Sequence, residues 1–161
     1  DVYKRQVTLE MAILDQGWPS LSMARGKVMF ALDNGGAKRE LYIEGHTSLK
    51  GRILFTDSPP GSPEAAFMKR NNPLAEPGLI EDLVAQGYLV RTRADADTVQ
   101  ARNNDTTQRD AALASGAHFI STDYPQPDPD FSSYEVRLPG GNTTRCNPVL
   151  PGECQNSDPG Q

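Results

Sequence analysis

The chain has 161 residues, of which 37% are hydrophobic and 23% charged, a composition typical of one ordinary globular domain or of part of one. Its net charge is −5 and its acidic and basic residues are interspersed, so there is no basic stripe that would favour nucleic acid as a partner. No apolar run approaches the length of a membrane span. The first six residues, DVYKRQ, join no recognisable element, and we expect residues 1–6 to be a leader that is not native to the fold.

Apolar runs of strand length alternate with segments of helical character along the chain. In chain order, the pattern predicts a helix over 9–17, strands over 27–34, 52–57 and 65–69, a helix over 79–87, a strand over 88–95, a helix over 105–116 and a strand over 117–122. Most of the strand runs are continuously apolar and do not alternate with polar residues. This pattern is typical of strands that are covered on both faces in a parallel sheet.

Glycines mark the ends of the three predicted helices. Gly17, Gly87 and Gly116 each follow the last turn of a helical segment, and glycine readily adopts the left-handed backbone that ends many helices. At the start of the third helix, Asp105 and Gln108 have the spacing of a loose capping box.

Alternating strands and helices imply βα units and therefore an α/β fold. Four or five such units are about half of a TIM (β/α)8 barrel, which takes about 250 residues, so we predict that residues 7–125 are the C-terminal portion of such a barrel. An open doubly wound sheet is the main alternative, although the sequence has no glycine-rich phosphate loop. Residues 126–161 are rich in Pro, Gly and Asp, which predicts an irregular tail with one short strand around residues 134–138.

Two arginines lie near the end of the predicted strand over 88–95, where a barrel builds its active site. Alternation along the strand places Arg91 and Arg93 on one face. A guanidinium is a planar fork of hydrogen-bond donors, so this pair suits a phosphate or a carboxylate. The structural alternative is an ion-pair network with the nearby carboxylates of Asp95, Asp97 or Asp123.

Other polar residues near strand ends give weaker signals. Lys69 could supply a third cation at the same end of the barrel, which we call its mouth. Asp33 could face this mouth from the DNGG turn. His46 lies in a polar stretch before a strand, and His118 lies at the start of its strand, which is the wrong end for a barrel site. We expect both histidines to be structural, and the sequence shows no pair suited to acid–base catalysis.

The only two cysteines, Cys146 and Cys154, lie in the segment CNPVLPGEC. Its proline and glycine residues let so short a loop fold back on itself, which predicts a disulfide in an oxidising compartment. Two free thiols in a reducing compartment are the alternative. A zinc site is disfavoured because neither histidine lies close in sequence to complete a set of ligands.

Long phrases of the sequence, over residues 24–34, 51–73, 87–125 and 145–154, resemble the C-terminal part of the bacterial calcium-dependent, phosphoinositide-specific phospholipase C-like family. The resemblance implies a phosphoric diester hydrolase with a phospholipase C-like barrel. It also implies two catalytic histidines, and Ca²⁺ held by carboxylates and an amide at the ends of the early strands. Those residues belong to the N-terminal half of the family's barrel. We therefore expect this chain to contain neither the catalytic residues nor the Ca²⁺ ligands, and to be inactive by itself.

The resemblance implies that this chain contributes the substrate side of the barrel mouth. Its expected contacts with a phosphate or headgroup are Arg91, Arg93, Lys69 and Tyr124, with Asp123 and Asp33 as orienting residues that hold such contacts in place. The expected partner is a phosphoinositide or another phosphodiester, with transient contact with a membrane surface, and the expected location is secreted or periplasmic.

Two other functions remain open. The segment ending in Thr-Asp-Tyr-Pro also resembles glycerophosphodiester phosphodiesterases, which belong to the same superfamily. A noncatalytic barrel that binds an anionic ligand or a protein is the second alternative. A half barrel would leave unpaired sheet edges, so we expect residues 7–161 alone to be loosely folded or poorly soluble.

Overall fold

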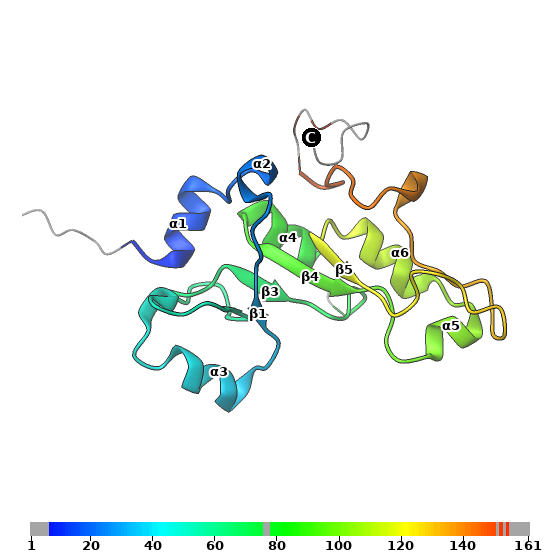
Figure 1. Cartoon of the computed structure of the whole chain (residues 1–161), viewed down its shortest axis with the longest axis horizontal. Helices are drawn as coiled ribbons and strands as arrows, with labels where there is room; N and C mark the ends of the chain where they lie inside the picture. Colours follow the sequence, from blue (N-terminus) through cyan, green and yellow to red (C-terminus); the bar gives the residue numbers. More distant parts are fainter. Residues whose placement is uncertain (1–6, 76–77, 151, 153, 155–161) are drawn as a thin grey trace, which may run out of the picture. The chain divides into compact units, whose positions relative to one another are not determined.

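A computed structural model describes residues 7–75, 78–150, 152 and 154 of the chain (Figure 1). The expected leader, residues 1–6, lies outside the described residues. The protein is a mixed α/β structure with two small parallel sheets, of strand order β1-β2 and β3-β4-β5. The chain divides into two compact units, Asp1–Met68 with Gln86–Leu89, and Lys69–Ala85 with Val90–Gln161.

The first unit contains the elements from the start of the chain to β3. They are α1 (Leu9–Gln16), α2 (Leu21–Ala24), β1 (Ala31–Leu32), α3 (Gly36–Ile43), the 3-10 helix η1 (Thr47–Leu49), β2 (Phe55–Thr56) and the first residues of β3 (Phe67–Lys69). Helix α1 begins where the Thr8 hydroxyl accepts a hydrogen bond from the Met11 amide, and it ends at Gly17, which has the predicted left-handed backbone (φ 75°).

Hydrogen bonds to residues far away in sequence fix α1 within the first unit. The Glu10 carboxylate accepts hydrogen bonds from the Tyr88 hydroxyl and from the Gly61 amide, each at 2.6 Å. The Trp18 indole donates to the Gly87 carbonyl at 3.0 Å, and its ring contacts Phe55. These bonds connect α1 and the segment after it to residues that are far away in sequence.

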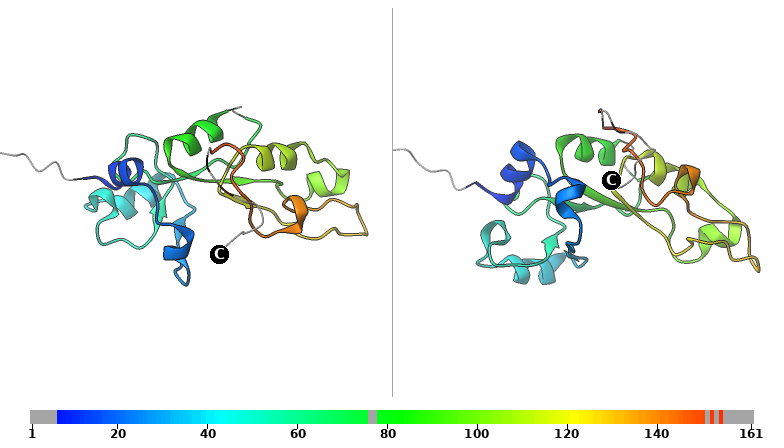
Figure 2. Two further views of the ribbon diagram at one scale, coloured as in Figure 1. Left: turned by 90° about the horizontal axis from the view of Figure 1, so that it is seen from above. Right: turned by 45° about the horizontal axis from the view of Figure 1, so that its top comes forward.

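The second unit contains the remaining elements. They are most of α4 (Leu79–Gln86) and of β4 (Leu89–Arg93), then α5 (Val99–Asn103), α6 (Thr107–Ala114), β5 (Phe119–Ser121) and the 3-10 helix η2 (Pro139–Gly141). Helices α4 and α6 lie on one side of strands β4 and β5 (Figure 2). The core of this unit is formed by α4, β4, α6 and the tail, with buried side chains from Ile80, Leu83, Val84, Val90, Ala112 and Tyr134.

Strand β4 shows the predicted alternation of its side chains. Val90 and Thr92 are fully buried, whereas Leu89, Arg91 and Arg93 are partly exposed. In the described residues, therefore, only one face of β4 is buried, so the expectation that the strands are covered on both faces is not met at β4. Phe119, which pairs in register with Arg91 on β5, is likewise 46% exposed. The expectation is met at β3, where the adjacent residues Phe67 and Met68 are both buried.

Several local predictions were wrong. Strands β1 and β2 keep only two residues each of the predicted runs 27–34 and 52–57. The predicted DNGG turn is not found, because residues 33–35 have no regular structure and α3 begins at Gly36. Gln108 does not complete a capping box, since its side chain donates to the Arg93 carbonyl at 3.1 Å.

The tail is irregular, as predicted, but the expected strand around 134–138 is not a strand. Tyr134 is instead buried in the second unit, and Val136 makes a single backbone hydrogen bond to Tyr124. The predicted disulfide between Cys146 and Cys154 is present. Inside the loop that it closes, the Asn147 side chain donates to the Gly116 carbonyl at 2.7 Å, so the loop is attached to the end of α6.

Candidate functional site

The exposed face of β4 carries a guanidinium that is bound only by neutral groups. Arg91 donates from Nε to the Ser121 hydroxyl and from Nη1 to the Asn71 side-chain carbonyl, both at 2.7 Å. Ser121 ends β5, and Asn71 follows β3. Within the described residues Arg91 has no carboxylate partner, so its positive charge is held in a fixed direction without being neutralised.

Arg93 lies on the same face of β4, two residues further along, and pairs in register with Ser121. Its backbone carbonyl accepts from Gln108, and its side chain is partly exposed. Among the residues that the structure describes, no hydrogen-bond or ion-pair partner is found for the Arg93 guanidinium. The structure thus brings the two predicted arginines together on one face, on the side of the strand away from α4 and α6.

Two residues after the end of β4, Asp95 is only 1% exposed. One of its oxygens accepts the Asp123 amide at 3.0 Å, and the other accepts the Thr122 hydroxyl at 2.5 Å and faces the Tyr134 hydroxyl at 3.3 Å. The Tyr134 hydroxyl also lies 3.1 Å from the Ala94 carbonyl. Asp95 therefore binds the segment after β5 and the tail, and it does not form the ion pair with an arginine that the sequence left open.

Two neighbouring residues on this segment, Asp123 and Tyr124, were predicted to take part in the site. Asp123 is exposed, and within the described part of the chain its carboxylate has no ion pair with Arg91 or Arg93, so the expected pairing is not found. The Tyr124 amide donates to the Thr122 hydroxyl at 2.9 Å, and its phenol lies 3.4 Å from the Asp97 carbonyl. The Tyr124 ring packs edge-on against Tyr134 with the centroids 5.7 Å apart.

The phenol of Tyr134 stays protonated at ordinary pH. Burial raises its pKa strongly, and the negative charge of Asp95 and the hydrogen bond to it raise the pKa further. Tyr134 is therefore a neutral donor in this cluster and not a general base.

The two remaining predicted residues belong to different units. Lys69 ends β3, is partly buried and lies in the second unit with the arginines. Asp33 is exposed just after β1 in the first unit. Both residues have interactions in the structure, and neither is assigned a role by its position alone.

The two histidines have structural environments, as expected. His46 Nδ1 lies 2.8 Å from the Lys50 carbonyl. His118 Nδ1 accepts a hydrogen bond from the Val90 amide at 3.2 Å, at the start of β5 and so at the opposite end from Thr122. Desolvation lowers the pKa of His118, which keeps this ring neutral and suited to accept that hydrogen bond.

The described residues do not fit a Ca²⁺ ion. Among them there is no group of three or more His, Cys, Asp or Glu side chains that could hold a metal. Both oxygens of the buried Asp95 already accept hydrogen bonds from protein donors, so they are not directed at a cation.

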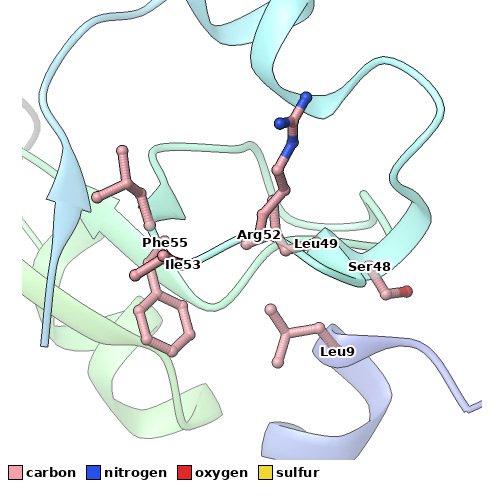
Figure 3. A pocket seen from close by; sticks show the side chains of 7 residues that line it. Leu9, Ser48, Leu49, Arg52, Ile53 and Phe55 are labelled. Carbon is pink, nitrogen blue, oxygen red and sulfur yellow. The ribbon is translucent and has the colours of Figure 1, made fainter.

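A separate apolar hollow lies in the first unit (Figure 3). It is lined by Leu9, Ser48, Leu49, Arg52, Ile53, Leu54 and Phe55. The Arg52 guanidinium points away from this hollow, and its Nε donates to the Tyr42 carbonyl at 2.8 Å. The hollow therefore offers apolar surface and one hydroxyl, without a charged group aimed into it.

Sequence reasoning missed Asn71, Ser121 and Tyr134 as residues that organise the cluster. It noted Thr122 only as a polar residue at a strand end and considered Asp95 only as a partner for an arginine. The available signal was weak. Asp95 is an acidic residue at the end of a buried strand, and such a carboxylate needs several donors, which the hydroxyls in the Ser-Thr-Asp-Tyr phrase could supply.

The fold and the cluster define a mixed α/β protein whose parallel strand β4 presents two arginines near its C-terminal end. The family model for phosphoinositide phospholipase C, Ca²⁺-dependent, matches residues 1–148, and the chain belongs to this family of phospholipase C-type hydrolases. No significant match is found to a curated protein or to a solved structure. None of the described helices is long and apolar enough to cross a membrane.

Proposed function

We propose that this chain forms the substrate-binding side of a phosphodiesterase site that acts on phosphoinositides, within the C-terminal portion of a TIM barrel. The family match supports the reaction class. The observation that carries the proposal is the pair of guanidiniums on β4, because Arg91 is bound only by neutral acceptors and Arg93 has no partner within the described residues. Two uncompensated guanidiniums on one face favour a phosphate, which they can bind with paired hydrogen bonds.

In this proposal Arg91 and Arg93 bind the phosphate oxygens of the substrate. Lys69 adds positive charge beside them, and the Tyr124 phenol contacts the headgroup. The catalytic histidine pair and the Ca²⁺ ligands of the family belong to strands other than those described here, and no step through the metal is assigned to this chain. The disulfide between Cys146 and Cys154 supports a secreted or periplasmic location, because such bonds persist in oxidising compartments.

Calorimetric titration of the chain with myo-inositol 1-phosphate tests the proposal, with myo-inositol as the uncharged control ligand. We expect Arg91→Gln and Arg93→Gln each to weaken phosphate binding about tenfold or more, because each removes a charge-assisted hydrogen bond. Arg137→Gln is the matched control, since Arg137 is also an arginine of the second unit but is paired with Glu135 at 2.7 Å. Equal affinity in all three variants would contradict the proposed site.

The substrate class is tested by comparing ligands. Tighter binding of myo-inositol 1-phosphate than of glycerol 1-phosphate supports a phosphoinositide substrate, whereas the reverse order would favour a glycerophosphodiester. In a protein that also carries the catalytic residues of the family, release of inositol phosphate from phosphatidylinositol should require Ca²⁺. A complete catalytic set without any such release would exclude the phospholipase activity.

A further inference from the structure

Asp95 is the only charged residue among the fully buried residues described in the second unit. A buried carboxylate is costly unless donors satisfy its oxygens. Its donors are the Asp123 amide, the Thr122 hydroxyl and the Tyr134 hydroxyl, and none of them carries a positive charge. The carboxylate is therefore stabilised by the segment that it binds.

The Thr122 hydroxyl connects Asp95 to the backbone of the residues that follow. It donates its proton to Asp95 at 2.5 Å and accepts the Tyr124 amide at 2.9 Å, so a single orientation serves both hydrogen bonds. The Asp123 amide between them is bound directly by Asp95 at 3.0 Å. Together these bonds fix the backbone of residues 122–124.

The hydrogen bonds of Asp95 are also connected to the face of β4 that carries Arg91 and Arg93. Ser121 precedes Thr122 and accepts the Arg91 guanidinium, and the Ser121 carbonyl accepts the Ala94 amide at 2.9 Å. The end of β5 is thus held by Arg91 and Ala94, which precede Asp95, and by Asp95 itself. A change at residue 95 or 122 would loosen Ser121 and with it the direction of Arg91.

We infer that Asp95 is a positioning residue for the proposed phosphate site, acting through Thr122 to hold Ser121, Arg91 and Tyr124 in place. This inference rests on the proposed function for its ligand. Asp95 itself does not touch the substrate, because both of its oxygens face protein donors in a buried position.

Asp95→Asn has two consequences that should change the affinity for phosphate in opposite directions, namely the loss of a negative charge and the loss of positioning. Removing a negative charge near two guanidiniums would by itself strengthen the binding of an anion. Asparagine has one acceptor oxygen in place of two, so it cannot accept both the Thr122 hydroxyl and the Asp123 amide. This loss would instead weaken binding, because the 121–124 segment would become less well ordered. Thr122→Val removes the bridging hydroxyl with little change of shape and leaves the charge of Asp95 unaltered, so only positioning predicts weaker binding in this variant.

The experiment uses the 161-residue chain, with myo-inositol 1-phosphate as the ligand in calorimetry and with hydrogen exchange followed by mass spectrometry. We expect Asp95→Asn and Thr122→Val to weaken binding about three- to tenfold and to speed exchange of the amides of residues 123 and 124 about tenfold. Asp123→Asn is the matched control, since it removes an exposed carboxylate of the same segment without removing the hydrogen bond of its backbone amide. It should leave exchange unchanged and binding unchanged or slightly tighter.

Unchanged or tighter binding in both Asp95→Asn and Thr122→Val, with exchange as in the wild type, would overturn the inference. If Asp95→Asn fails to fold, Thr122→Val gives the same test. If the wild-type chain binds no inositol phosphate, the proposed function fails, and faster exchange at 123 and 124 in the variants would still support the role of Asp95 in holding this segment.

Discussion

Arg91 and Ser121 are joined across the parallel strands β4 and β5, with the guanidinium Nε donating to the serine hydroxyl at 2.7 Å. This bond directs an arginine whose charge no carboxylate neutralises within the described residues. Because of this bond, the Arg91 guanidinium on the five-residue strand β4 keeps a fixed orientation. The hydroxyl at the end of β5 is therefore as relevant to the site as the arginine.

Ser121→Ala should weaken phosphate binding less than Arg91→Gln does. Arg91 keeps its bond to Asn71 and its charge, and it loses only one neutral acceptor, so we expect an effect of about three- to fivefold. The measurement is the same calorimetric titration. Ser133→Ala, at an exposed serine of the tail, should have no effect. A loss as large as that of Arg91→Gln would mean that Ser121 contacts the ligand itself.

Gly116→Ala should destabilise the second unit strongly. Gly116 has φ 75°, and an added Cβ would overlap the Val149 side chain and lie 3.0 Å from Asn147 Oδ1. Strain and displacement of the disulfide loop together should lower the free energy of unfolding by about 2 to 4 kcal/mol, measured by urea denaturation.

Gly141→Ala is the control for the backbone strain alone. Gly141 has φ 73° in the same unit, with nothing within 4 Å of an added Cβ. This variant should cost only about 1 to 2 kcal/mol. Equal effects of the two substitutions would show that the contact between the loop and Gly116 does not contribute to stability.

Removal of the disulfide with Cys146→Ser and Cys154→Ser should lower stability by about 2 to 3 kcal/mol, because the bond closes a loop with a sequence separation of 8 residues. Alkylation of the unfolded chain, made under oxidising conditions, should label no thiol before reduction and both thiols after it. Labelling of both cysteines without reduction would contradict the disulfide and the proposed secreted or periplasmic location.

Stability should fall at alkaline pH because of Tyr88. Burial, together with the hydrogen bond to Glu10 and the negative charge of Glu10, raises the pKa of Tyr88 from 10.0 to about 12. The folded state therefore favours the neutral phenol. Its contribution is complete below the unfolded pKa of about 10 and is lost as the pH rises through the folded pKa.

Urea denaturation at pH 8 and pH 11 measures this dependence. Tyr88→Phe should cost about 1 kcal/mol at pH 8, where the hydrogen bond to Glu10 is lost, and should reduce the loss of stability between the two pH values. Tyr134, whose pKa is also raised, should account for part of the loss that remains. An unchanged pH dependence in Tyr88→Phe would mean that Tyr88 does not contribute to it.

The local pattern of the sequence was enough to predict the main elements that carry the site. The apolar run and its alternation predicted β4 with Arg91 and Arg93 on one face, and α4 follows the predicted helix up to Gly87. Proline and glycine between Cys146 and Cys154 were enough to predict the disulfide. These features depend on the spacing of neighbouring residues, which the sequence states directly.

The partners of the arginines could not be predicted in this way. Whether Arg91 faces a carboxylate or a hydroxyl depends on the register between β4 and β5, and a shift by one residue would turn the side chains of β5 to the other face. The sequence suggested Asp123 as the residue that holds an arginine, whereas the fold buries Asp95 and leaves Asp123 exposed.

The sequence by itself therefore determined the order of strands β1 to β5 and of helices α1, α4 and α6, the two cations on β4 and the disulfide, whereas α2, α3 and α5 were not predicted. Only the tertiary structure decided that Arg91 is bound by Ser121 and Asn71 and that the Asp95 carboxylate holds the segment after β5. The physical reason is that these contacts join residues more than 15 positions apart, and their geometry is set by strand register and burial and not by local pattern.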